Sequence, residues 1–409
     1  MKRKVCFSFT FIVMICLIFC FGISANAAEI AETGKVGDNV TWVLSDDGEL
    51  VISGTGEMYD YDNETNYSPF HLGNIRKVVI EDGVTSIGAG AFEYAHLLTE
   101  ITIADSVTSI GDRAFENAYN LKGISISDKV INIGDDAFLG CSSLENITVD
   151  PNNKHYSNDG YGVFFNKDKT YLIACPAQNT VKEYVIPDSV KVINSYAFYS
   201  CHKIVSIVIP DGVTDIPSNA FQGCMKLISV TIPDGVTSIG DYAFANCYDL
   251  ENITLPEALT SIGERALWAC SSIISLTIPE GITEIPSYAF SCSSLTNITI
   301  PDSVVTIGSQ AFYCCESATS IKIGKNVKEI GFGAFWGCKI IESILIPASV
   351  EEIKTELERR YKEIAFRYAN KIPTIEVTNE MEHLQGKTAF YRKTLRIFHP
   401  ERIIIYQLM

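Results

Sequence analysis

The dipeptide Ala-Phe recurs along this chain at a fixed interval, and this recurrence restricts the fold more than any other feature. Successive pairs are 23 residues apart, except for one step of 22 residues and one of 60 residues. One pair is altered, because Ala266 is followed by Leu267. A constant period of this length is typical of a solenoid, in which every repeat forms one turn of a continuous coil. The pairs begin at Ala91, Ala114, Ala137, Ala197, Ala220, Ala243, Ala266, Ala289, Ala311 and Ala334.

The repeat that ends at Phe244 shows how each turn of the coil is expected to fold. The stretch Ile228–Ile232 alternates in the manner of a strand, and Pro233–Gly235 supplies residues that favour a turn. Apolar residues then follow at helical spacing, namely Val236, Ile239, Ala243 and Phe244. We therefore expect a strand, a turn, a short buried helical turn and a return. The expected helix N-caps are Asp112, Asp135, Ser195, Ser218, Asp241, Ser287 and Ser309.

No single repeat buries its apolar side chains alone, so neighbouring repeats must cover both of its faces. We expect the strands to form one continuous parallel sheet on one face of the solenoid, with the short helical turns on the other. The predicted strands lie near residues 98–103, 121–126, 144–149, 204–209, 227–232, 250–255, 273–278, 295–300, 318–323 and 341–346.

The segments that flank or interrupt the repeats define the other expected parts of the chain. Residues 28–74 are expected to form an N-terminal β-hairpin cap and loop, and residues 75–353 the solenoid. An inserted hairpin at residues 150–183 accounts for the long step between Ala pairs, and we expect it to protrude. Residues 354–409 are expected to form a C-terminal helix and a divergent tail with a net charge of +4, which stands apart from the acidic remainder.

Residues 1–27 are expected to be a signal peptide. Lys2, Arg3 and Lys4 precede an apolar stretch from Val5 to Ile23, and Ala25-Asn26-Ala27 fits a cleavage site. The alternative is an uncleaved membrane anchor, because the apolar stretch is long enough to span a bilayer. Either interpretation predicts export, to the cell surface or the medium, and the first predicts no membrane insertion after cleavage.

The repeats resemble the BspA-like leucine-rich-repeat family. The motif is carried by ITIADSVTSIGDRAFENAYNL (Ile101–Leu121) and VTIPDGVTSIGDYAFANCYDL (Val230–Leu250). The segments Val40–Met58 and Gly162–Ala177 resemble stretches that accompany such repeats in secreted bacterial proteins. The resemblance covers about residues 35–353 and implies an α/β repeat solenoid that is secreted or displayed on the cell, with adhesins among its relatives. It implies no catalytic residues.

The cysteines after residue 27 recur in phase with the Ala-Phe pairs. Their most economical interpretation is a buried column of small apolar side chains. Disulfides between successive turns are the alternative, since stacking would place the Cα atoms near 5 Å apart. A metal site is a weaker alternative, because no histidine recurs with the column. The in-phase members are Cys141, Cys201, Cys224, Cys247, Cys270, Cys315 and Cys338, with Cys292 and Cys314 one residue earlier.

Composition and motifs argue against several classes of function. The net charge of −17 disfavours nucleic acid as a partner. The chain contains no phosphate-binding glycine loop, no paired-carboxylate motif and no zinc-binding helix, so we predict no cofactor, no metal site and no catalytic residues. The scattered histidines form no recognisable catalytic set.

Two surfaces are candidates for ligand binding. Outward-facing strand positions form a polar face for a protein or glycan on host or other cells, and its threonines are Thr102, Thr148, Thr231, Thr254, Thr277 and Thr299. Aromatic side chains after the Ala-Phe pairs form a possible stripe opposite the sheet, with Tyr199, Trp268, Tyr313 and Trp336 as anchors. Structural roles, in sheet packing and in packing between turns, are the alternatives for both.

The sequence therefore predicts an extracellular binding module rather than an enzyme. The first alternative is a structural spacer that displays another segment away from the cell. An enzyme within residues 354–409 is a further alternative, although that segment is short for a core of its own.

Overall fold

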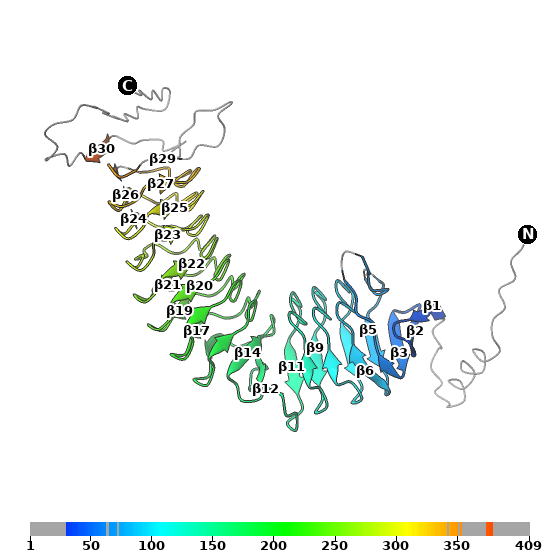
Figure 1. Cartoon of the computed structure of the whole chain (residues 1–409). Helices are drawn as coiled ribbons and strands as arrows, with labels where there is room; N and C mark the ends of the chain where they lie inside the picture. Colours follow the sequence, from blue (N-terminus) through cyan, green and yellow to red (C-terminus); the bar gives the residue numbers. More distant parts are fainter. Residues whose placement is uncertain are drawn as a thin grey trace, which may run out of the picture.

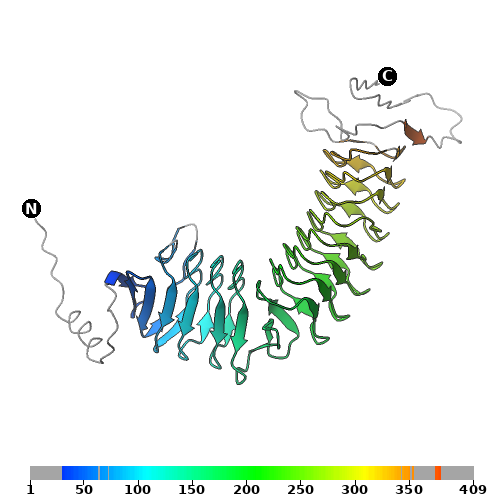
Figure 2. The same cartoon turned by 180° about the vertical axis from the view of Figure 1, so that it is seen from behind.

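The computed structural model describes residues 30–62, 65–71, 73–341, 343–350, 352–353 and 374–378. The expected signal peptide and the expected C-terminal helix before residue 374 lie outside these residues. The described chain forms a curved rod in which each repeat is one turn, here called a rung. Two arms of the rod meet around β12 (Tyr156–Asn158) and β14 (Tyr171–Ala174), as Figure 1 and the reverse view in Figure 2 show.

The first strand of each rung lies on one face of the rod, and neighbouring first strands within each sheet pair in parallel, as predicted. Ser206, for example, lies opposite Ser229 in the next rung. These strands are β5 (Lys77–Ile80), β7 (Glu100–Ile103), β9 (Gly123–Ile126), β11 (Asn146–Val149), β15 (Glu183–Val185), β17 (Ser206–Val208), β19 (Ser229–Thr231), β21 (Asn252–Ile253), β24 (Asn297–Thr299), β26 (Ser320–Lys322) and β28 (Ser343–Pro347).

The prediction of one continuous sheet is wrong, because this face is divided into several sheets. Their orders are β1-β2-β3-β5-β7, β11-β9, β15-β17-β19-β21 and β24-β26-β28-β30. The predicted strand at 273–278 does not form. This gap precedes the 22-residue step, in which the loop from Phe290 to Leu295 is one residue shorter than the loop from Phe244 to Leu250. The strand of the next rung therefore begins one residue earlier, counted from Ile274, than it would in a regular 23-residue repeat.

The expected helical turns are also absent, since the described residues contain no helix. After its first turn each rung forms a second short strand instead. These strands are β6 (Val84–Ile87), β8 (Ser109–Ile110), β10 (Asn132–Ile133), β16 (Val192–Ile193), β18 (Asp215–Ile216), β20 (Ser238–Ile239), β22 (Ser261–Ile262), β23 (Glu284–Ile285), β25 (Thr306–Ile307), β27 (Glu329–Ile330) and β29 (Glu352–Ile353).

Local geometry explains why no helix forms around Ala243 and Phe244. Tyr242 and Asn246 have φ angles of 55° and 61°, in the left-handed region, which a right-handed helix cannot include. The Phe244 N–H donates across to the carbonyl of Ala266 in the next rung, at 2.8 Å. The expected N-caps act between rungs as well: the carboxylates of Asp112 and Asp241 accept the N–H groups of Asp135 (3.0 Å) and Glu264 (2.7 Å).

A column of stacked phenylalanine rings runs through the core. Phe221 lies 5.1 Å from both Phe198 and Phe244, measured between ring centroids, and all three side chains are buried. At the N-terminal end Phe70 extends the column, and the edge of Trp42 covers it at 5.5 Å. The ends are closed by strands: β1 (Ile30–Lys35), β2 (Val40–Ser45) and β3 (Glu49–Gly54) pair antiparallel, β3 pairs with β5, and β4 (Gly56–Glu57) pairs with β6.

At the other end, β30 (Thr374–Thr378) pairs in parallel with β28 and adds a strand to its sheet. Residues 374–378 lie within the segment 354–409, for which the sequence analysis predicts a C-terminal helix and a divergent tail. None of the described segments forms a helix long and apolar enough to cross a membrane.

The inserted segment is built into the rod and does not protrude. Strand β13 (Phe164–Asn166) pairs antiparallel with β12 and β14, and β14 pairs in parallel with β16. Phe164 and Phe165 are fully buried on opposite sides of this strand. Phe164 packs with the core of the N-terminal arm and Phe165 with the core of the C-terminal arm, so the insertion joins the two cores.

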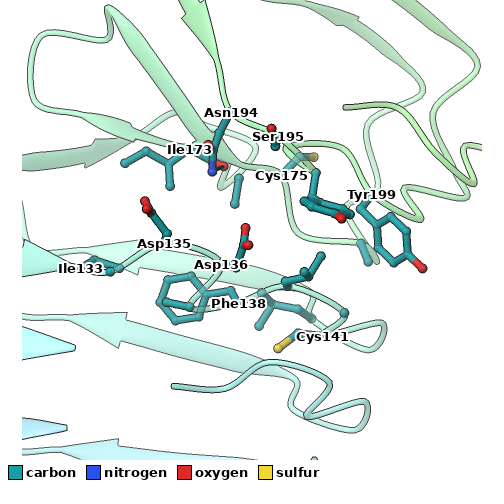
Figure 3. Close-up of a pocket in the computed structure, with 18 of the residues that line it drawn as sticks. Ile133, Asp135, Asp136, Phe138, Cys141, Ile173, Cys175, Asn194, Ser195 and Tyr199 are labelled. Carbon is teal, nitrogen blue, oxygen red and sulfur yellow. Dashed lines mark hydrogen bonds between the residues drawn. The ribbon is translucent and has the colours of Figure 1, made fainter. Parts of the chain in front are cut away.

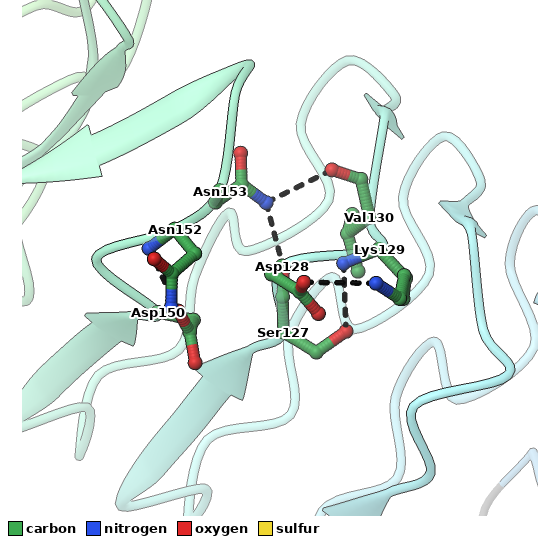
Figure 4. A network of polar contacts seen from close by, with 7 residues as sticks. All are labelled: Ser127, Asp128, Lys129, Val130, Asp150, Asn152 and Asn153. Carbon is green, nitrogen blue, oxygen red and sulfur yellow. Dashed lines mark hydrogen bonds and ion pairs between the residues drawn. The ribbon is translucent and has the colours of Figure 1, made fainter.

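A buried asparagine fixes the start of the insertion (Figure 4). The side-chain amide of Asn153 donates to the carbonyls of Ser127 (2.7 Å) and Val130 (2.9 Å) in the preceding rung. Its carbonyl oxygen accepts the N–H groups of His155 and Tyr156, both at 2.8 Å. Asn153 thus satisfies the backbone groups left open where the repeat is interrupted.

The thiol groups of the cysteine column donate hydrogen bonds to backbone carbonyls. The thiols of Cys224, Cys247 and Cys270 donate to the carbonyls of Phe198, Phe221 and Phe244 in the preceding rungs, at 3.1, 3.2 and 3.1 Å. All the described cysteines are free, and Cys292 and Cys314 are the half-buried ones. Burial raises the pKa of Cys270 to about 12. The thiolate, which is the reactive form, is therefore disfavoured at Cys270.

We predict that Phe221→Ala or Phe244→Ala lowers the free energy of unfolding by about 3–5 kcal/mol, because each removes a ring from a column shared by its neighbours. Denaturant melts measure this change. Tyr248→Ala is the control, because Tyr248 is exposed. Midpoints unchanged in both phenylalanine variants would contradict a shared core.

We also predict that Cys224, Cys247 and Cys270 resist alkylation until the protein unfolds, whereas the half-buried Cys314 reacts in the folded state. Mass spectrometry after alkylation, with and without denaturant, tests this. Native disulfides between Cys224 and Cys247, or between Cys247 and Cys270, would show instead that the column is cross-linked.

Candidate functional site

The threonines predicted to form a polar face are all exposed, but the structure divides them between the two arms. Thr102 and Thr148 lie in β7 and β11 of the N-terminal arm. Thr148 is tied to Ser125, with 2.9 Å between the two hydroxyl oxygens. The remaining four, Thr231, Thr254, Thr277 and Thr299, lie in consecutive rungs of the C-terminal arm. The insertion separates the two groups, so they do not form one surface.

In the C-terminal arm the threonine column continues a column of exposed valines. Val185 lies opposite Val208, and Val208 opposite Thr231, in the register of β15, β17 and β19. The side chains of Val185 and Val208 are 64% and 38% exposed. This face is therefore partly aliphatic as well as polar.

The face is hollowed where the strand at 273–278 is missing. The hollow, here called the sheet hollow, has a volume of about 570 Å³ and is lined by residues 229–232, 251–254, Ser272, Ile274 and Ser275. Thr231 and Thr254 lie in its wall, whereas Thr277 does not. Ile274 is 59% exposed beside it, and Glu251 is the single charged residue in the lining.

Two backbone hydrogen bonds between rungs are not made at the end of the strands beside the sheet hollow, although β19 and β21 pair with each other. In other rungs of this arm the isoleucine after the strand donates to the next rung: Ile209 N–H to Thr231 O at 3.0 Å, and Ile300 N–H to Lys322 O at 2.8 Å. The equivalent N–H groups of Ile232 and Leu255 have no such partner in the described part of the chain. These open main-chain donors make the hollow different from the rest of the face.

The aromatic positions do not form a continuous stripe. All four side chains are half-buried. Tyr313 and Trp336 contact each other on adjacent rungs, with ring centroids 6.1 Å apart. Trp268 has no ring contact with either of them, and Tyr199 pairs instead with Tyr196 at 5.8 Å. Tyr199 and Tyr196 both line a separate cavity at the junction of the arms.

This cavity, here called the junction pocket, has a volume of about 350 Å³. One wall is the segment from Ile133 to Ser142, and the other is the segment from Asn194 to Ser200. Figure 3 shows the carboxyl groups of Asp135 and Asp136 extending from the first wall toward Asn194 and Cys175. The ring of Tyr199 lies at one side of the space.

The pocket exists because the rung that separates its walls is shortened. Ala174-Cys175 lies 23 residues before Ala197-Phe198, so Cys175 stands at a phenylalanine position of the repeat. The hydrogen-bond pattern confirms this equivalence, since Cys175 N–H donates to Ala197 O at 2.6 Å, as Phe198 N–H does to Ala220 O at 2.8 Å. Leu172 pairs with Ile193 in the next rung. Only Ile173 lies between Leu172 and Ala174, so this rung is two residues shorter than the next one at this place. The next rung has Asn194, Ser195 and Tyr196 at that place.

The wall of the junction pocket is acidic. Burial raises the pKa of Asp136, and the neighbouring charge of Asp135 raises it further, while Arg113 opposes the shift. In the preceding rung, burial and then Glu93 raise the pKa of Glu116 to about 7. The residues that line the pocket include no lysine or arginine.

Sequence reasoning singled out Tyr199 but not the pocket around it. A signal was present: Ala174-Cys175 continues the 23-residue phase through the 60-residue step, with cysteine in place of phenylalanine. Among the described residues no group of three or more His, Cys, Asp or Glu side chains is placed to hold a metal ion.

Several solved structures are similar to the chain, including the following three. A leucine-rich repeat protein from Eubacterium ventriosum is 28% identical, over 69% of this chain and 94% of that one, with a TM-score of 0.48. A leucine rich cell surface protein from Faecalibacterium prausnitzii is 21% identical, over 81% and 97%, with a TM-score of 0.36. The pneumococcal vaccine antigen PcpA is 16% identical, over 86% and 95%, with a TM-score of 0.38. No curated protein matches the chain.

The family comparison agrees with the resemblance seen in the repeats. The model of the BspA type leucine rich repeat region matches residues 64–181, 174–294 and 283–403, with 6 copies. These matches span the solenoid and most of the segment after it. The chain therefore belongs to the family of BspA-type leucine-rich repeat proteins.

Proposed function

We propose that this protein is an extracellular binding module that recognises a protein partner through the sheet face of its C-terminal arm, and that it is not an enzyme. The basic and apolar segment at residues 1–27 supports export. The BspA-like repeats, whose relatives include adhesins, support a role in surface recognition. The repeated and rigid architecture supports binding without a large conformational change.

The observation that carries the proposal is the sheet hollow beside Thr231 and Thr254. It combines a concave surface, an exposed aliphatic side chain at Ile274 and the open N–H group of Ile232, and the N–H of Leu255 is open directly after the lining residue Thr254. Exposed apolar surface next to unmade backbone hydrogen bonds is suited to an extended segment of another protein, which supplies carbonyl acceptors as well as side chains.

The low charge of the sheet hollow disfavours a highly charged polymer as the partner. The lining of the sheet hollow carries one charged side chain, Glu251, and the threonine and valine columns beside it are uncharged from Val185 to Thr299. Recognition there rests on shape, apolar burial and short-range hydrogen bonds. We therefore expect the affinity to depend only weakly on salt concentration.

We predict that Thr231→Arg/Thr254→Arg/Thr277→Arg abolishes binding, because three long charged side chains fill the face and resist desolvation. The measurement is surface plasmon resonance of the secreted protein against purified extracellular-matrix proteins, together with flow cytometry on host and bacterial cells. The matched control is Thr237→Arg/Thr260→Arg/Thr283→Arg, which changes exposed threonines of the same rungs outside the sheet hollow.

Three outcomes of these binding measurements would lead to a different conclusion. Equal binding by the first arginine variant and by the control would contradict the sheet-face proposal. Loss of binding in Trp268→Ala/Trp336→Ala, with the arginine variant unaffected, would assign recognition to the aromatic positions. If the wild type binds nothing across the panel, a structural spacer becomes the better description of this protein.

A further inference from the structure

We propose that the junction pocket is a second binding site, and that it binds a sugar residue that is neutral or carries an amine. This site is separate from the sheet hollow, because the two share no lining residue. The proposal does not depend on the function suggested for the sheet face, and either site can fail its test while the other stands.

The first argument concerns backbone donors that the shortened rung leaves open. In the preceding rung the N–H groups of Arg113, Phe115 and Asn117 donate to the carbonyls of residues 135, 137 and 139 in the next rung, at 2.9, 2.9 and 2.7 Å. One repeat later the equivalent donors are Asp136, Phe138 and Gly140. These three have no such partner within the described part of the chain, and all three line the pocket. The pocket therefore contains a row of open hydrogen-bond donors.

The second argument concerns Asp135. At the same position in other rungs, Asp112 and Asp241 use a carboxylate oxygen to accept an N–H from the rung that follows. Asp135 is followed by the shortened rung, and its side chain has no hydrogen bond to any described residue. An exposed carboxylate directed into a cavity is available to accept hydroxyl or amine donors.

These groups together select the chemistry of the ligand. The carboxylates of Asp135 and Asp136, with no lysine or arginine in the lining, disfavour an anion. A simple cation would use the carboxylates but leave the row of N–H donors without acceptors. A sugar ring carries hydroxyl groups that both donate and accept, and it has an apolar face that packs on an aromatic ring. Tyr199 and Tyr196 offer such rings.

The size of the pocket agrees with this choice. Its volume of about 350 Å³ lies at the lower end of the range for small-molecule sites. One sugar ring, or two at most, would fill it. Asn194 adds a further polar group at the upper wall, where its oxygen already accepts the Tyr171 hydroxyl at 2.6 Å.

Saturation-transfer difference NMR on the full secreted chain tests the proposal. The probes are methyl glycosides of glucose, galactose and mannose, N-acetylglucosamine, glucosamine, glucuronate, putrescine and the tetrapeptide Asp-Ala-Phe-Leu. We expect transfer to at least one neutral or amino sugar, with affinity of about millimolar strength, and none to glucuronate.

Variants test whether the sugar that gives the transfer signal binds in the junction pocket. Asp135→Asn/Asp136→Asn and Tyr199→Ala should each weaken binding of the same sugar about tenfold. Their matched controls are Asp241→Asn and Tyr313→Ala, which change the equivalent positions of rungs outside the pocket and should leave binding unchanged. Denaturant midpoints of all variants establish that the fold is retained, and Asp135→Asn alone serves if the double variant unfolds.

Several outcomes would overturn the proposal. Absence of transfer to every sugar would exclude the site, and equal transfer in pocket variants and controls would place the sugar elsewhere. Transfer to putrescine alone would show that the pocket binds a cation. Transfer to the tetrapeptide in place of the sugars would show that the gap accepts the main chain of a peptide.

Discussion

The backbone hydrogen bond between adjacent rungs is the interaction on which this structure depends. In the segments around Phe221 and Phe244 some N–H groups bond within their own turn, such as Ala245 to Tyr242, but those of Phe221 and Phe244 donate across to Ala243 and Ala266 in the next rung. A buried amide without a partner costs as much as a lost hydrogen bond, so no rung is complete without the next one. The stacked rings and the thiol donors follow from this arrangement, because a bond at every rung holds equivalent side chains directly above one another.

Both candidate sites lie where this ladder of bonds is interrupted. At the sheet hollow a strand is missing and the N–H groups of Ile232 and Leu255 are left open. At the junction pocket the rung containing Cys175 is too short to reach the donors of Phe138 and its neighbours. A regular solenoid satisfies its own backbone and offers little to a ligand beyond side chains. An interrupted one offers concavity and directed polar groups at the same place.

The 23-residue period was sufficient to predict the solenoid, the parallel pairing and the buried phenylalanines, since each follows from stacking identical units. The spacing of Val236, Ile239 and Ala243 was not sufficient to distinguish a helical turn from what forms. A short strand at Ser238–Ile239 followed by turns places the same residues in the core, and the left-handed φ of Tyr242 is invisible to a hydrophobic pattern. The threonine positions were predicted as exposed, but their separation into two arms depends on how the insertion packs. The pocket was not predicted because it results from residues that are absent from one rung, the rung that contains Cys175.

The solenoid tolerates such interruptions because each rung contacts only its neighbours. In a domain with one central core, replacing a buried phenylalanine by cysteine and removing two residues would disturb packing throughout. Here Phe164 and Phe165 of the insertion cover the cores on either side, and Asn153 satisfies the backbone where the repeat is left. The ring column resumes at Phe198, whose ring centroid lies 5.1 Å from that of Phe221, compared with 5.3 Å between Phe92 and Phe115. The structural cost of the pocket is thus confined to the junction, and the regular rungs on both sides hold its two walls in place.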